Sequence, residues 1–207
     1  MPFPDFDRGA LAWRAIDGRV IFLDVAADRY FRLSDKENHA FLAAIARGER
    51  LGWRQPPEFA RPNHWLPPAQ TAPAVLEGSF NLAETARALW LQRRVERRLA
   101  ATGLHAVLTD FQRLLATGAT RSSGDEARTD RVVRAFEHAR LLRSAASRCL
   151  TRSLALSTGL AAQGTQVSVV IGVKLAPFAA HCWAQCGDAV ISDSVDEVQC
   201  YAPLLVL

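Results

Sequence analysis

The chain has 207 residues, of which 49% are hydrophobic, and its formal net charge is +4. This length and composition allow one large domain or two small ones around a packed core. The N-terminus lacks a secretory signal, and no apolar run approaches the roughly 20 residues that span a bilayer, so we expect a cytoplasmic protein with no membrane partner.

The positive charge comes almost wholly from arginine, with lysine only at Lys36 and Lys174. The densest run, QRRVERR at residues 92–98, interleaves its charges with Val95 and Glu96. This pattern is typical of a solvated helix face rather than of an RNA-binding surface. We therefore expect no nucleic-acid partner.

The N-terminal segment predicts a β-meander followed by a helix. Its alternating apolar residues predict three strands, at residues 11–16, 19–25 and 29–33. Asp17-Gly18 is a strong hairpin signal between the first two strands. Ser34 and Glu37 have the spacing of a capping box, which predicts a helix that runs to about Arg47.

The residues that follow predict a proline-rich linker and then a second, larger unit. Prolines between residues 51 and 78 disfavour a regular helix there. Beyond them we expect helices at 81–101 and 104–116, a third that is capped by Thr129 or Asp130, and a fourth from Cys149 to about Gly164. The expected strands lie at 166–173, 178–186 and 189–193. We interpret the chain as an α+β protein with domains at residues 1–78 and 79–207.

Three residues of the last third occur in the settings that a cysteine hydrolase requires. Cys149 stands at the front of an amphipathic helical stretch, where the helix dipole and free N–H groups favour the thiolate. His181 lies in a strand-like segment with Trp183 on the same face, and Asp193 follows an apolar run. A cysteine nucleophile needs a base, and the base needs an orienting acid. We therefore interpret Cys149, His181 and Asp193 in those three roles.

Each assignment has a plainer alternative. Cys149 could be an ordinary buried cysteine, and His181 a hydrogen-bonded structural histidine. Asp188 competes with Asp193, although Gly187-Asp188 is a turn signal in which aspartate is common for local reasons. Asp196 lies further along, in a polar segment.

A zinc site is the alternative chemistry for the same region. All four cysteines come after residue 148, and without a secretory signal we expect free thiols. Together with His181, the later cysteines Cys182, Cys186 and Cys200 are of the types that bind Zn²⁺. Strand alternation places Cys182 and Cys186 on one face and His181 on the other, which argues against shared coordination. We expect no metal site.

The last third also resembles a known family. The segments RCLTRSLALSTGLAAQG, VSVVIGVKLAPFAAHCWAQ and AVISDS are similar to those of the lasso-peptide leader peptidases, the B proteins of lasso-peptide biosynthesis, which have a transglutaminase-like fold. The resemblance implies that Cys149 is the nucleophile, His181 the base and Asp193 the orienting acid.

The N-terminal segment DGRVIFLDVAADRYFRLSDKENHAFLAAI resembles the RiPP recognition element, a small winged-helix-like domain. In that family the leader peptide adds as a strand to an exposed sheet edge. The resemblance makes Tyr30, Phe31 and Arg32, on the third strand, the candidate leader-binding residues.

The two resemblances imply a cysteine peptidase that removes the leader of a lasso-peptide precursor. Its partners would be that precursor and an ATP-dependent macrolactam synthetase, which closes the ring on the freed amine. The chemistry requires no cofactor, and the sequence lacks a G-x-x-x-x-G-K-[ST] loop, so any ATP dependence would come through the synthetase. A transglutaminase-like acyltransferase with the same triad is the first alternative, and a non-catalytic zinc- or nucleic-acid-binding protein is the second.

Overall fold

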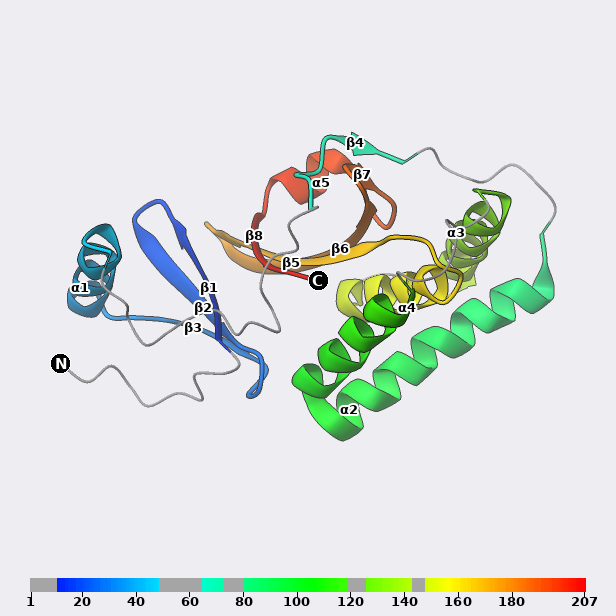
Figure 1. The fold of residues 1–207 in the computed structure, drawn as a ribbon, viewed down its shortest axis with the longest axis horizontal. Helices are drawn as coiled ribbons and strands as arrows, with labels where there is room; N and C mark the ends of the chain where they lie inside the picture. Colours follow the sequence, from blue (N-terminus) through cyan, green and yellow to red (C-terminus); the bar gives the residue numbers. More distant parts are fainter. Residues whose placement is uncertain (1–10, 49–64, 73–79, 119–125, 143–147) are drawn as a thin grey trace.

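The computed structural model describes residues 11–48, 65–72, 80–118, 126–142 and 148–207. They form two β-sheets and a group of helices, which confirms the α+β fold class expected from the sequence. Figure 1 shows the first sheet lying between helix α1 (Asp35–Ala46) and the second sheet.

The first sheet is the predicted antiparallel meander. Its order is β1-β2-β3, with β1 at Leu11–Ile16, β2 at Arg19–Asp24 and β3 at Arg29–Arg32. Asp17 and Gly18 have φ values of +48° and +74°, the left-handed values that the hairpin turn requires. Both hydrogen bonds of the capping box between Ser34 and Glu37 are present at the start of α1. These elements are confirmed, and β2 and β3 each end one residue before the predicted limit.

Helix α2 (Leu82–Gly118) contains both of the helices predicted between residues 81 and 116. Gly103 interrupts it with φ 76° and ψ 174°, so that two helical arms meet at this residue. The Asn81 side chain accepts a hydrogen bond of 3.1 Å from the Glu84 N–H, as expected of the residue that caps the first arm.

Helix α3 (Glu126–Leu142) starts earlier than predicted. Thr129 and Asp130 lie within the helix, so the prediction that one of them caps it is wrong. The preceding Glu126 and Ala127 are good helix formers, and the Thr129 hydroxyl bonds the Thr165 hydroxyl at 3.0 Å instead of a backbone N–H. Helix α4 (Cys149–Ala161) begins at the predicted residue.

The second sheet has the order β4-β7-β6-β5-β8. Its strands are β4 (Gln70–Thr71), β5 (Ser168–Leu175), β6 (Phe178–Cys186), β7 (Ala189–Val190) and β8 (Ala202–Val206). Strand β6 matches its prediction. The strand predicted at 189–193 ends at Val190, because the Ser192 hydroxyl takes the place of a backbone carbonyl as acceptor for the Ala184 N–H, at 2.9 Å.

Three elements of this region were not predicted. They are β4, the short helix α5 (Val195–Gln199) and β8. Pro203 lowers the strand signal of β8, and β4 has only two residues, which pair in parallel with β7.

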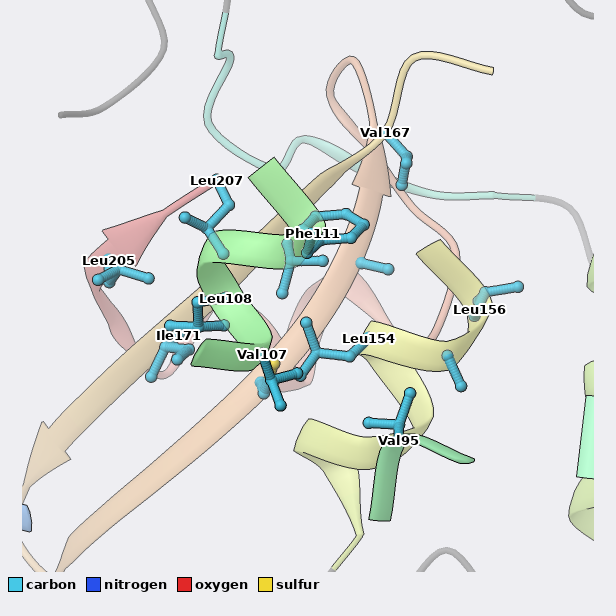
Figure 2. Packing of buried hydrophobic residues seen from close by; sticks show 14 of the residues in the cluster. Val95, Val107, Leu108, Phe111, Leu154, Leu156, Val167, Ile171, Leu205 and Leu207 are labelled. Atoms are coloured by element: carbon cyan, nitrogen blue, oxygen red, sulfur yellow. The ribbon is translucent and has the colours of Figure 1, made fainter. Parts of the chain in front are cut away.

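The main hydrophobic core fills the space between the helices and one face of β5, β6 and β8. Figure 2 shows Leu108 and Phe111 of α2 packed against Leu154 of α4 and against Ile171 of β5. The opposite face of the sheet packs Val170 and Trp183 against Val198 of α5. The helices and α5 therefore cover opposite faces of the sheet.

The first sheet joins the main core rather than standing apart from it. Ile21 and Leu23 of β2 belong to the same buried cluster as the β8 residues, and β1 contacts β8. Residues 70–71, placed by the sequence with the N-terminal domain, pair in the second sheet. The predicted boundary at residue 78 lies outside the described residues and stays a prediction.

Candidate active site

Cys149 lies at the N-terminus of α4, as its sequence setting predicts. Arg148 occupies the cap position without a side-chain hydrogen bond, and the first turn contains no acidic residue. The backbone N–H of Leu150 is thus able to donate to the Cys149 sulfur. A second backbone N–H, from Cys182 of β6, reaches the sulfur from the sheet. The thiol therefore receives donors from two elements.

His181 bridges Cys149 and Asp193. Its Nε2 lies 2.9 Å from the Asp193 Oδ2, and its ring also hydrogen-bonds the Cys149 thiol. This leaves Nδ1 as the nitrogen that faces the sulfur. The other carboxylate oxygen of Asp193 accepts a 2.8 Å hydrogen bond from the Ser194 N–H, which fixes the carboxylate. The structure thus brings the three predicted residues into one chain of hydrogen bonds.

Their electrostatics favour a thiolate beside an imidazolium. Burial alone raises the pKa of Cys149, but the hydrogen bonds from His181 and from the N–H groups of Cys182 and Leu150 outweigh it and hold the pKa below its ordinary value. The hydrogen bonds to Asp193 and then to Cys149 raise the pKa of His181 to about 9. The bond from His181 in turn lowers the pKa of Asp193. Each charge stabilises its neighbour, and the pair suits nucleophilic attack on an acyl carbon.

Two aromatic rings cover the imidazole on the α5 side of the sheet. The ring centroid of Tyr201 lies 5.2 Å from that of His181, and the ring of Trp183 stacks at 6.3 Å, as its place on the same strand face predicts. Gly172 of β5 is the register partner of His181, and a Cβ there would lie 2.7 Å from the Trp183 ring and 3.0 Å from Tyr201. The glycine therefore makes room for the rings that cover His181.

The sequence analysis missed the polar contacts that hold these elements together. Ser153, one turn after Cys149, donates a 3.0 Å hydrogen bond to the Cys182 carbonyl and lies 3.3 Å from the hydroxyl of Ser192. Ser192 directly precedes Asp193. Ser153 thus connects α4 to β6 and to the segment that carries Asp193. Its position four residues after Cys149 on one helix face was the signal that could have revealed it.

Arg152 supports the same site electrostatically. Its side chain is largely buried and its Nη2 lies 2.6 Å from the Glu137 carboxylate of α3. Its positive charge also helps to lower the pKa of Asp193, after the larger effect of His181. The positive charge of Arg152 therefore acts on the Asp193 carboxylate as well as on Glu137.

The other aspartates considered for the role of Asp193 form hydrogen bonds with residues outside the proposed triad. Asp188 accepts a hydrogen bond from the Gln70 side chain at 3.1 Å, and the Asp196 carbonyl accepts one from the Cys200 thiol. The Cys182 and Cys186 side chains belong to the main core, away from the face of His181. No group of three or more histidine, cysteine or acidic side chains within the described ranges is arranged to hold a metal ion.

The candidate leader-binding residues lie on β3, the edge strand of the first sheet. Their side chains differ in direction. The Phe31 ring stacks on Phe22 at 4.9 Å, on the side of α1, and Arg32 is exposed. Tyr30 faces the second sheet, where its ring lies 5.6 Å from that of Phe178 at the start of β6.

Residues 87–206 match the family model of the transglutaminase-like superfamily. Proteins of this superfamily are typically cysteine-based enzymes, so the match supports peptidase or acyltransferase-type chemistry. No curated protein and no solved structure matches the chain. No helix within the described ranges is long and apolar enough to cross a membrane.

Proposed function

The chain belongs to the transglutaminase-like superfamily, and we propose that it is a cysteine peptidase that removes the leader of a lasso-peptide precursor. Cleavage would free the α-amine of the core peptide for macrolactam formation by an ATP-dependent synthetase. The observation that carries the proposal is the hydrogen-bonded series Cys149, His181 and Asp193 at the start of α4. The similarity of the surrounding segments to lasso-peptide leader peptidases supports the choice of substrate.

The reaction begins with the thiolate of Cys149, which attacks the carbonyl carbon of the scissile peptide bond. A tetrahedral intermediate forms and its oxygen becomes negatively charged. Backbone N–H groups at the start of α4, that of Cys149 among them, are suited to stabilise this oxyanion because the positive end of the helix dipole lies there.

The imidazolium of His181 then donates its Nδ1 proton to the leaving nitrogen as the C–N bond breaks. The core peptide departs with a free amine, and the leader remains as a thioester on Cys149. In the second half, neutral His181 takes a proton from water, the resulting hydroxide attacks the thioester carbonyl, and the leader leaves as a carboxylic acid. Asp193 keeps Nε2 paired, so that Nδ1 always faces the reacting atoms.

The first sheet supports a leader substrate in particular. Strand β3 has no described partner on its outer edge, which suits the addition of an extended peptide as a further strand. The reaction needs no metal or organic cofactor, and any ATP dependence would arise from the synthetase. A cytoplasmic location, where both partners would be made, belongs to the same proposal.

An acyltransferase with the same triad is the alternative, since only the acceptor differs. Incubation of the purified protein with the short precursor that we expect to be encoded beside its gene, followed by mass spectrometry, tests the proposal. We expect a leader with a free carboxylate and a core with a free amine. Addition of a primary amine such as cadaverine distinguishes the two reactions, because an acyltransferase would yield mainly the leader amide. An intact precursor, with cleavage absent also when the synthetase is added, would refute the peptidase function.

A further inference from the structure

Tyr30 connects the first sheet to strand β6, which carries His181. Its ring forms an edge contact with the Phe178 ring, with 5.6 Å between centroids and 64° between ring planes. Phe178 lies three residues before His181 on β6 and projects from the same strand face as Cys182. Tyr30 packs against the main core, as Cys149 also does. The contact thus joins the edge strand β3 to the strand that carries the base.

The surroundings of the Tyr30 phenol keep it protonated, and the charge of Cys149 contributes to this. Burial is the largest cause that raises the pKa of Tyr30, and the negative charges of Cys182, Asp28 and Cys149 raise it further. The phenol therefore stays protonated and remains a hydrogen-bond donor at every pH at which the enzyme would work. Its hydroxyl makes no hydrogen bond with any residue that the structure describes, so this donor is available.

Phe178 offers the complementary surface. Its side chain is 49% exposed although it contacts Tyr30, which leaves apolar ring surface open three residues before His181 on β6. A subsite for one peptide residue needs such a surface for the side chain and a polar group for the backbone. The half-exposed ring and the free phenol hydroxyl supply the two parts.

We propose, on the basis of the peptidase function above, that Tyr30 and Phe178 form the subsite for the leader residue that precedes the scissile bond. The Phe178 ring contacts an uncharged, apolar side chain of that residue, and the Tyr30 hydroxyl donates a hydrogen bond to the leader backbone. A charged side chain is disfavoured there, because it would lose hydration against the ring without gaining a partner. Since β3 binds the leader along its edge, the same strand places the leader's last residues beside Cys149.

Two alkylating probes test the subsite without the precursor. In a Cys200→Ser background, which lacks the exposed thiol, iodoacetamide is small and reports on the reactivity of the Cys149 thiolate without probing the subsite. N-acetyl-phenylalanine chloromethyl ketone reaches the same sulfur, but it must also place its side chain on the leader side of the site. The ratio of the two second-order rate constants therefore isolates the contribution of the subsite.

We expect Phe178→Ala to lower this ratio about tenfold, the effect of losing part of an apolar pocket, while the iodoacetamide rate changes by less than about twofold. Tyr30→Phe should lower it about threefold through the lost hydrogen bond. Phe80→Ala is the matched control, because Phe80 is 56% exposed and lies just before α2, where its ring contacts that of His138. It should leave the ratio unchanged. The glutamate analogue of the ketone should react more slowly with the wild-type protein, and by a smaller margin with Phe178→Ala.

An unchanged ratio in both Phe178→Ala and Tyr30→Phe would overturn the subsite, and so would an equal loss in Phe80→Ala. This outcome is separate from the fate of the proposed function. If the wild-type protein does not cleave the precursor but the ratio of alkylation rates falls in the variants as expected, leader removal is refuted and the subsite stands. If the wild-type protein cleaves the precursor but the ratio is unchanged in Phe178→Ala and Tyr30→Phe, the proposed function stands and the subsite is refuted.

Discussion

Two neighbouring regions of the molecule shift the pKa of a cysteine thiol in opposite directions. At the start of α4 the pKa of the Cys149 thiol is lowered, whereas on the core face of β6 burial raises the pKa of Cys182 well above its ordinary value. The two sulfurs are close enough for the charge of Cys149 to raise the pKa of Cys182 further. Burial raises the pKa of both thiols, of the half-buried Cys149 and of the fully buried Cys182, so burial by itself does not explain the opposite directions.

The difference lies in the donors that each sulfur receives. Cys149 receives hydrogen bonds from His181 and from backbone N–H groups of α4 and β6, while the Cys182 thiol receives a weaker contribution from Ser153. Burial then strengthens the donors around Cys149 and leaves Cys182 inert. Local donors, more than exposure, thus determine which cysteine can act as a nucleophile.

Substitution of Cys149 or of its hydrogen-bond partner His181 should have the largest effect on activity. We expect Cys149→Ala and His181→Ala each to reduce kcat by at least about 10³-fold, because nucleophile and base act as one unit. Cleavage of the precursor, followed by mass spectrometry, measures the loss. Cys200→Ser is the control and should retain full activity, since this cysteine is exposed and, among the described residues, its thiol donates a hydrogen bond to the Asp196 carbonyl. Normal cleavage by Cys149→Ala would remove the nucleophile assignment.

Asp193→Asn should have a smaller effect, about 10²-fold, because the imidazole keeps its bond to Cys149. The pH profile is the more specific readout. In the wild type, activity should fall above pH 9, where His181 with its pKa of about 9 loses the proton that the leaving amine needs. It should also fall on the acid side as Cys149 is protonated. Because Asp193 is the main cause of the raised pKa of His181, the variant should shift the alkaline limb to lower pH. An unshifted limb would contradict this role.

Gly172→Ala tests whether the Trp183 and Tyr201 rings that pack against His181 matter for activity. The added Cβ would lie 2.7 Å from the Trp183 ring, so the ring or β5 must move. We expect about 1–3 kcal/mol of destabilisation, from overpacking, and a loss of activity through displacement of His181. Thermal denaturation and cleavage rates measure the two effects. Gly159→Ala is the control, since its Cβ would meet a Val132 methyl at 3.3 Å and needs only a small adjustment. Equal effects of the two variants would argue against a special role of Gly172.

The sequence was sufficient to predict those elements and candidate site residues that have a local sequence pattern. A cysteine at a helix start and a histidine on an alternating strand are local features, and so are the capping box of Ser34 and the Asp17-Gly18 hairpin. The pairing of β4 with β7 and the position of β8 next to β5 were not visible, because they join segments far apart in the chain. The same holds for the contact of Tyr30 with Phe178, which depends on how the two sheets pack. Local signals predicted the parts of the candidate site, and the tertiary fold determines what surrounds them.

The smallest effect in this comparison should come from two serines of α4. Ser153 donates its hydroxyl proton to the Cys182 carbonyl at 3.0 Å, whereas the buried Ser157 hydroxyl, one turn later, has no hydrogen-bond partner among the described residues. Ser153→Ala leaves that carbonyl without its partner and should destabilise the protein by about 1–3 kcal/mol.

Because the Ser153 bond also fixes β6 against α4, Ser153→Ala should lower kcat by several fold with little change in KM. Ser157→Ala removes an unsatisfied polar group and should be neutral or slightly stabilising. Denaturant unfolding and steady-state cleavage of both variants provide the comparison. If the two variants lose stability equally, hydrogen bonding to β6 cannot be the reason why Ser153 matters. If only Ser153→Ala loses activity, the distance between α4 and β6, which sets the distance from the sulfur to the imidazole, is held by a side chain outside the triad.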